Sequence, residues 1–98
     1  MAGLTMDDMP ARLVPSPDAL ARELNGEVLI LDLRSSHYFG LTGPGARIWQ
    51  LAEAGEDTGG IVAALTREFE GDVAIIEADV VRLLGELIDR GLLIADPA

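Results

Sequence analysis

The chain has 98 residues, 49% of them hydrophobic, which suits one compact domain with a modest core and is too short for two ordinary domains. It contains no cysteine, which excludes disulfide scaffolds, thiol nucleophiles and cysteine-based zinc sites. Seventeen acidic residues oppose seven arginines and no lysine, and the formal net charge is −10. Phosphate contacts need clustered basic side chains, and these arginines are scattered, so we expect no nucleic-acid binding.

The N-terminus lacks the basic region and apolar run of a secretory signal, and no apolar stretch approaches the roughly 20 residues of a membrane-spanning helix. We therefore expect a soluble, cytoplasmic domain without membrane contacts. Residues 1–11 show no sustained period and include Pro10, which interrupts helices and central strands. We predict a flexible N-terminus over residues 1–11 and one folded domain over residues 12–95.

The first part of this domain, residues 12–24, has an ambiguous pattern. Leu13 and Val14 are typical of a strand, whereas residues 16–18 offer a capped start for a short helical turn through Leu20. We predict a short strand followed by an irregular connection.

Two clearer strands follow a turn dipeptide. Asn25 and Gly26 both tolerate positive φ, and the apolar run after them predicts a strand over residues 27–33. A polar link over residues 34–36 leads to a second predicted strand over residues 37–42, paired with the first as a hairpin.

Three helices are predicted after the strands. The first is capped by Thr42 and runs from Pro44 to about Ala54. The second is capped by Asp57 or Thr58, with apolar residues recurring at helical spacing from position 61 to 69. The third spans roughly residues 74–90 and precedes a short apolar tail. Strands followed by three helices predict an α+β fold that resembles a winged helix-turn-helix, with a three-stranded antiparallel sheet.

The third helix does not have the surface of a DNA-reading helix. Recognition helices carry Arg, Lys, Asn or Gln toward the bases. The exposed positions of this helix include Asp79, Arg82, Glu86 and Asp89. A winged-helix transcription regulator is therefore a competing hypothesis that the topology favours and the acidity opposes.

Catalytic and cofactor chemistry has little support in the sequence. His37 is the only histidine, and it follows Ser35 and Ser36 on a strand where neighbouring side chains point to opposite faces. The segment over residues 43–45 is glycine-rich and opens a helix, but it lacks the pattern and the lysine of a phosphate loop. We therefore expect a non-enzymatic domain without a metal or cofactor.

Apolar residues form two adjacent stripes on the third helix at about 100° per residue. A helix in so small a domain needs only the first stripe for the core, so the second either lines a groove or is covered by the N-terminal segment or the tail. The first stripe contains Ile76, Val80, Leu83 and Leu87, and the second contains Val81, Leu84 and Ile88.

The strand over residues 37–42 complements that helix. If the strand before it pairs on its other side with the N-terminal strand, residues 37–42 form a sheet edge with free N–H and C=O groups. An open edge beside an apolar helix face forms a cleft where an extended peptide can bind by strand addition.

Several runs in the chain resemble the PqqD-like family. They are LNGEVLILDL (residues 24–33), HYFGLT (37–42), GARIW (45–49), IVAAL (61–65), Asp79-Val80-Val81, Leu87 and the ending RGLL (90–93). Their order and spacing cover about residues 12–95. The resemblance implies a RiPP recognition element, a non-catalytic domain that binds the leader region of a ribosomally synthesised and post-translationally modified peptide.

Within that family the free-standing chain looks most like the discrete leader-binding proteins of lasso-peptide biosynthesis. The resemblance implies the precursor leader peptide, a leader peptidase and an ATP-dependent cyclase as partners. A role in the assembly of pyrroloquinoline quinone, beside a radical enzyme, is an alternative with the same fold.

The family's binding mode also implies which residues contact the leader. The pairing strand would contain Tyr38, Phe39, Gly40 and Leu41, and the helix wall would contain Val81, Leu84, Gly85 and Ile88. Arg82 either pairs with an acidic leader residue or is simply solvated.

Overall fold

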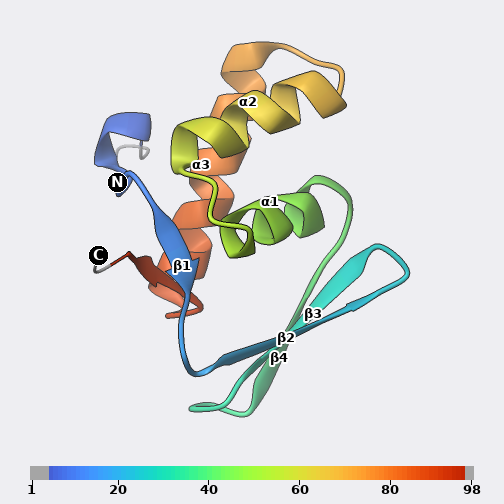
Figure 1. Ribbon diagram of the computed structural model, residues 1–98, viewed down its shortest axis with the longest axis vertical. Coiled ribbons are helices and arrows are strands. Elements are labelled where there is room, and N and C mark those ends of the chain that lie inside the picture. Colours follow the sequence, from blue (N-terminus) through green and yellow to red (C-terminus); the bar gives the residue numbers. More distant parts are fainter. Residues whose placement is uncertain (1–4, 97–98) are drawn as a thin grey trace.

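The computed structural model describes residues 5–96. Figure 1 shows the course of the chain through this part. In order, the elements are the 3-10 turn η1 (Met6–Asp8), strands β1 (Leu13–Pro15), β2 (Ala19–Leu24), β3 (Glu27–Asp32) and β4 (His37–Leu41), helices α1 (Gly43–Glu53), α2 (Thr58–Glu68) and α3 (Val73–Asp89), and strand β5 (Leu93–Ala95).

The main sheet has the order β2-β3-β4, and both pairings are antiparallel. The predicted α+β class, with a three-stranded antiparallel sheet followed by three helices, is confirmed. Strands β1 and β5 form a second, two-stranded sheet in which Val14 lies opposite Ile94. The strand predicted around Leu13 is therefore present, but it pairs with the C-terminal tail and not with β3.

Strand β2 corrects the prediction of an irregular connection before the hairpin. Asn25 and Gly26 have φ angles of 53° and 81°, the left-handed values of a two-residue hairpin turn. This turn folds residues 19–24 back onto β3, and Leu24 lies opposite Glu27. The local sequence hides the strand because Ala, Leu, Arg and Glu are better helix formers than strand formers.

The turn between β3 and β4 is organised by the Asp32 side chain. Its carboxylate accepts hydrogen bonds from the Arg34 backbone N–H (3.0 Å) and the Ser35 hydroxyl (2.9 Å), while the Ser36 N–H donates to its carbonyl (2.7 Å). Ser36 has a φ of 62°, a conformation that few non-glycine residues adopt. The bonds to the carboxylate, led by the one from the Arg34 N–H and supported by the Ser35 hydroxyl, hold the pKa of Asp32 below its usual value.

The helices begin and end close to the predicted residues. The Asp57 carboxylate accepts a hydrogen bond of 2.7 Å from the Gly60 N–H and so caps α2, while Asp72 caps α3 through the Ala74 N–H (2.8 Å). The glycine after α3, Gly91, has a φ of 73°, which ends the helix in the left-handed region.

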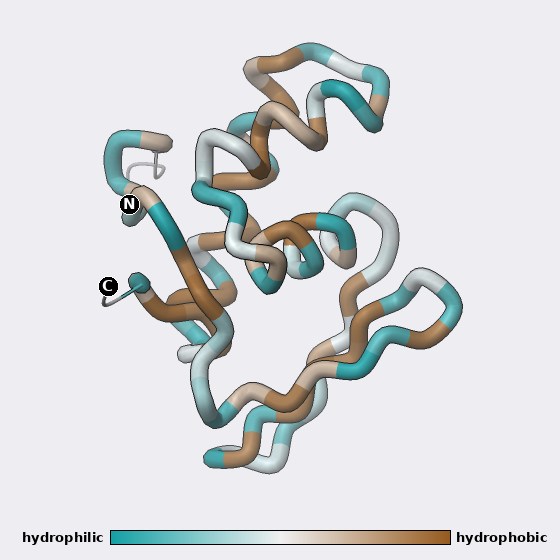
Figure 2. Tube along the Cα trace, in the orientation of Figure 1, coloured by the Kyte–Doolittle hydropathy of each residue, from teal (hydrophilic) through white to brown (hydrophobic). Residues whose placement is uncertain are grey.

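The core lies between the sheet, the helices and the β1–β5 pair. Trp49 of α1 is fully buried at its centre, together with Ile30 of β3 and Leu84 of α3. Hydrophobic segments of β1, α1 and α3 meet in this region (Figure 2). Side chains of a strand point alternately to its two faces, and the face turned away from the core also carries apolar residues. These include Leu20, Leu29 and Tyr38, which are exposed on the outer face of the sheet.

Residues 5–11 contact the body of the domain, where the sequence predicted a flexible start; residues 1–4 of that prediction lie outside the described residues. Met9 packs against the core, and the Thr58 N–H donates a hydrogen bond of 2.9 Å to the Ala11 carbonyl. Within residues 5–96, no helix is long and apolar enough to cross a membrane.

We expect Asp32→Asn to lower the free energy of unfolding at pH 7, because the neutral amide accepts the turn's hydrogen bonds more weakly than the carboxylate. The folded-state pKa is below the unfolded value, so the carboxylate's contribution is complete above the unfolded pKa and disappears as the pH falls through the folded pKa. Urea unfolding at pH 7 and near pH 2 measures the difference.

The matched control is Asp89→Asn, since Asp89 is exposed at the end of α3. It should leave the unfolding midpoint almost unchanged at both pH values. An equal loss of stability for Asp32→Asn at both pH values would contradict the role of the carboxylate.

Candidate peptide-binding groove

Strand β4 is an edge of the main sheet. In the described part of the chain its only paired neighbour is β3, so the groups on its other side are available to a further strand. Its sequence, His37–Leu41, lacks the lysine and proline with which proteins often protect an edge. The other edge strand, β2, is different because it carries Arg22 and Glu23.

Two hollows lie along β4 and share Gly40, Leu41 and Leu83 in their lining. The first, of about 310 Å³, is also lined by Tyr38, Phe39, Glu86, Leu87 and Arg90. The second, of about 390 Å³, is also lined by Thr42, Pro44, Gly45, Ile48, Asp79 and Arg82. We call the two together the β4–α3 groove.

The two faces of β4 place its four predicted site residues differently. Phe39 and Leu41 face the core side and are half-buried, whereas Tyr38 and Gly40 lie on the exposed outer face. All four line the groove, so the structure brings them together. Their contact with a peptide remains a prediction.

The predicted helix wall needs correction. Val81 is 2% exposed and Leu84 is 0% exposed, and Gly85 is also buried, so none of them offers a surface to a peptide. Ile88 is half-buried and packs against the core. Of the residues predicted on α3, only Arg82 lines the groove.

The apolar residues that line the groove from α3, Leu83 and Leu87, come from the neighbouring stripe. Leu83 is half-buried between the two hollows, where the sequence placed it in the core. Val81 is buried and lines a small hollow together with Thr5 and Met6 of the N-terminal segment. The second stripe is therefore enclosed within the domain, with Leu84 in the core and Ile88 packed against it.

Gly45 of α1 lies beside the two leucines of the groove. A Cβ atom on Gly45 would lie 3.5 Å from Leu83 Cδ2 and 3.7 Å from Leu41 Cδ2, which are ordinary van der Waals distances. Helices α1 and α3 and strand β4 therefore meet at this point of the groove.

Two arginines connect the sheet to the C-terminal end of α3. Arg34 donates hydrogen bonds from Nη2 to the carbonyls of Arg90 (3.4 Å) and Gly91 (3.2 Å). The Arg90 guanidinium lies 4.8 Å from the centre of the Phe39 ring, within the range of a cation–π interaction. These contacts join the C-terminal end of α3 to the β3–β4 turn and to β4 at this end of the groove.

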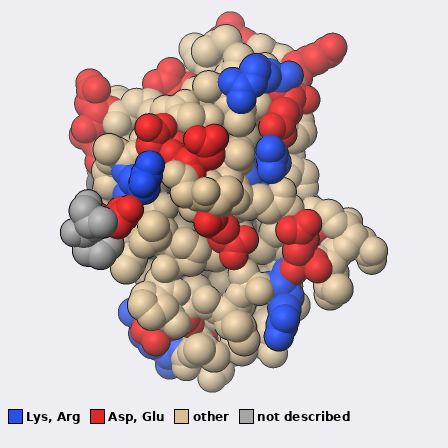
Figure 3. Space-filling model, viewed as in Figure 1, with Lys and Arg blue, Asp and Glu red and all other residues tan. Residues whose placement is uncertain are grey.

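The other charges of this region are largely paired. Arg82 and Glu86 form an ion pair of 3.0 Å one turn apart on α3. Arg47 binds Glu68 through two hydrogen bonds of 2.8 and 3.0 Å, which lower the pKa of Glu68. On the face shown in Figure 3, basic side chains lie apart from one another and form no patch of the kind that binds phosphate.

The residues considered for catalysis have structural roles. The Ser35 hydroxyl donates to Asp32 and accepts from the His37 backbone N–H (3.3 Å), so it is part of the β-turn. Among residues 5–96 no three acidic or histidine side chains gather in a way that could hold a metal ion.

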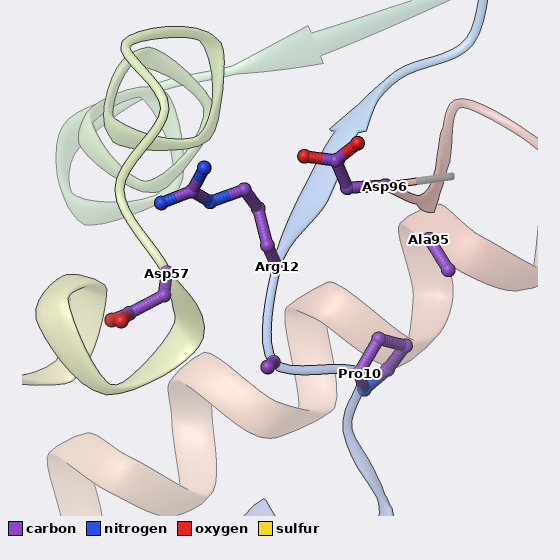
Figure 4. Close-up of a pocket in the computed structure, with 6 residues that line it drawn as sticks. Pro10, Arg12, Asp57, Ala95 and Asp96 are labelled. Atoms are coloured by element: carbon purple, nitrogen blue, oxygen red, sulfur yellow. The ribbon is translucent and has the colours of Figure 1, made fainter. Parts of the chain in front are cut away.

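A further hollow of about 390 Å³ lies near the chain ends, between β1, β5 and the start of α2 (Figure 4). Its polar groups do not converge on one point. The Asp57 carboxylate is turned toward α2, which it caps, and away from Arg12 (Figure 4). Backbone bonds from Thr58 to Ala11 and from Asp96 to Arg12 close this region. We therefore take the β4–α3 groove as the candidate site.

An α+β domain with an uncovered sheet edge beside a helix belongs to the class of small domains that can bind peptides by strand addition. The family model for coenzyme PQQ synthesis protein D (PqqD) matches residues 27–93, and the chain belongs to this family. The resemblance found in the sequence is thus confirmed. No curated protein matches the chain.

Two solved structures are similar to this chain. A structure of TbiB1 in complex with the TbiA(beta) leader peptide is 32% identical with a TM-score of 0.80, and the match covers 87% of this chain and 99% of that one. A structure of lasso peptide synthetase B1 complexed with the leader peptide is 25% identical with a TM-score of 0.78, covering 86% and 99%. Both neighbours were therefore solved with a leader peptide bound.

We expect Leu84→Ala to destabilise the domain by about 3 kcal/mol, since it leaves a cavity in a fully enclosed part of the core. Leu83→Ala should cost clearly less, because Leu83 is half-buried beside an open hollow. Urea unfolding monitored by circular dichroism compares the two. Equal losses would contradict the assignment of Leu83 to the groove and Leu84 to the core.

Proposed function

We propose that this chain is a RiPP recognition element that binds the leader region of a ribosomally synthesised precursor peptide, of the lasso-peptide type, by strand addition to β4. The observation that carries the proposal is the open β4 edge, with two hollows between it and α3. An added strand would hydrogen-bond to β4 through its backbone, and its alternate side chains would enter the hollows.

The family and the structural neighbours support this assignment. The chain is a member of the PqqD family, and both similar structures contain a leader peptide. The leader would bind without being chemically changed, and the chain would present the precursor to a leader peptidase and an ATP-dependent cyclase. The proposal of these two partner enzymes rests on the family resemblance. The absence of cysteine suits work in the reducing cytoplasm.

A second candidate function follows from the family's name. The matching model describes coenzyme PQQ synthesis protein D, so the same groove would bind the peptide precursor of pyrroloquinoline quinone. The two functions share the binding mode and differ in the peptide. Titration with each type of precursor distinguishes them, because only the true partner should bind in the low micromolar range or better.

The first test is a fluorescence-anisotropy titration with a labelled leader from the precursor peptide encoded beside this chain's gene. Wild-type protein should bind saturably. Leu83→Glu should weaken binding by about tenfold or more, since it places a charge on the apolar ridge between the hollows.

Ile75→Glu is the matched control, because Ile75 is a 62% exposed apolar residue of the same helix and lines neither hollow of the groove. It should bind like the wild type, and circular dichroism should show both variants folded. Amide exchange in residues 37–41 should slow when the leader binds. The absence of binding by wild type up to high micromolar concentrations would reject leader recognition by this chain.

A further inference from the structure

We propose that Asp79 and Arg90 select the charge order of the leader: a basic side chain bound at Asp79 and, about four or six residues later on the same face of the leader strand, an acidic side chain bound at Arg90. The inference rests on the proposed function and names the class of peptide that the β4–α3 groove prefers. It is built on two charged residues at the ends of the groove, Asp79 of α3 and Arg90 directly after α3, which line different hollows.

The spacing of the two residues puts them on the same side of α3. Eleven positions at about 100° per residue return to within roughly 20° of the starting direction, and the rise of 1.5 Å per residue separates them by about 16 Å. Asp79 lines the hollow beside Thr42 and Pro44, whereas Arg90 lines the hollow beside Tyr38 and Phe39.

The charges between these ends cancel each other. Arg82 and Glu86, one turn apart, form an ion pair of 3.0 Å and therefore contribute little net charge to the middle of the groove. Asp79 and Arg90 form no ion pair with other residues in the described part of the chain. Each hollow is thus lined by one member of this ion pair, Arg82 beside Asp79 and Glu86 beside Arg90, and the charges left without an ion-pair partner are Asp79 at one end and Arg90 at the other.

Arg90 is placed to bind a carboxylate. Its guanidinium carbon lies 4.8 Å from the centre of the Phe39 ring, and a guanidinium offers several N–H donors that can bind a carboxylate. The negative end of the α3 dipole would weaken the positive field of Arg90. Arg34 offsets part of this effect, because it already donates hydrogen bonds to the carbonyls of Arg90 and Gly91 at the end of the helix.

The effect of Asp79 should be the weaker of the two. Helix α1 begins at Gly43 beside the same hollow, and the positive end of its dipole, about half a charge, partly offsets the Asp79 carboxylate. Both ion pairs would be solvent-exposed, so each should change affinity by about two- to fivefold.

The direction of the leader follows from the sheet. Every pairing in the β2-β3-β4 sheet is antiparallel, and an antiparallel fourth strand continues this pattern. Strand β4 runs from the Arg90 end of the groove to the Asp79 end. An antiparallel leader therefore enters at Asp79 and leaves at Arg90. A length of about 16 Å spans roughly five residues of a strand, and side chains on one face recur every second residue, so the two charged leader residues lie about four or six positions apart.

The experiment selects peptides from a random-sequence mRNA-display library on immobilised wild-type chain and on the double variant Asp79→Arg/Arg90→Glu. Both residues are exposed, so circular dichroism should show the variant folded. Two synthetic peptides taken from the enriched family, of equal composition and opposite charge order, are then titrated against both proteins by fluorescence anisotropy.

We expect wild type to prefer the basic-before-acidic peptide by about tenfold, the combined effect of two exposed pairs. The double variant should reverse this preference. The same preference for both proteins, no preference, or the opposite order on wild type would overturn the charge-order proposal while leaving peptide binding intact. If no peptide is enriched on wild type, both this proposal and leader binding fail.

Discussion

The hydrogen bonding of β4 determines what this molecule can do. A strand in the middle of a sheet uses the N–H and C=O groups on both of its sides, but β4 uses one side only, because the chain turns directly from Leu41 into α1. Helix α3 then lies beside the unpaired side without covering it, and the two hollows remain between them. The contacts of Arg34 and Arg90 join α3 to the sheet at one end of the groove.

The sequence predicts the parts of the fold that are encoded locally. Caps and glycines mark the ends of the three helices, and the Asn25-Gly26 turn marks the hairpin, so these elements lie close to their predicted positions. Strand β2 escapes prediction because its residues favour a helix, and only pairing with β3 makes it a strand. The β1–β5 pair joins residues about 80 positions apart, and no local pattern indicates such a contact.

The difference between local and long-range encoding also explains which site residues could be predicted. The edge strand could be recognised from its order in the chain, and all four of its predicted residues line the groove. The helix wall could not, because α3 has apolar residues over nearly half its circumference. Periodicity shows that such a helix is buried on two sides but not which side meets a partner. The tertiary structure determines the side: Val81 is buried and shares a small hollow with the N-terminal segment, whereas Leu83 lies between the two hollows of the groove.

The pairing of β1 with β5 has a consequence for how the domain can be used. The first and last strands lie side by side in a sheet that shares no strand with β4, so the path of the chain enters and leaves the domain at one place (Figure 1). A polypeptide joined there, at either end, would leave the edge of the main sheet unobstructed. A linker to another protein could therefore start at the β1–β5 pair without covering the β4–α3 groove.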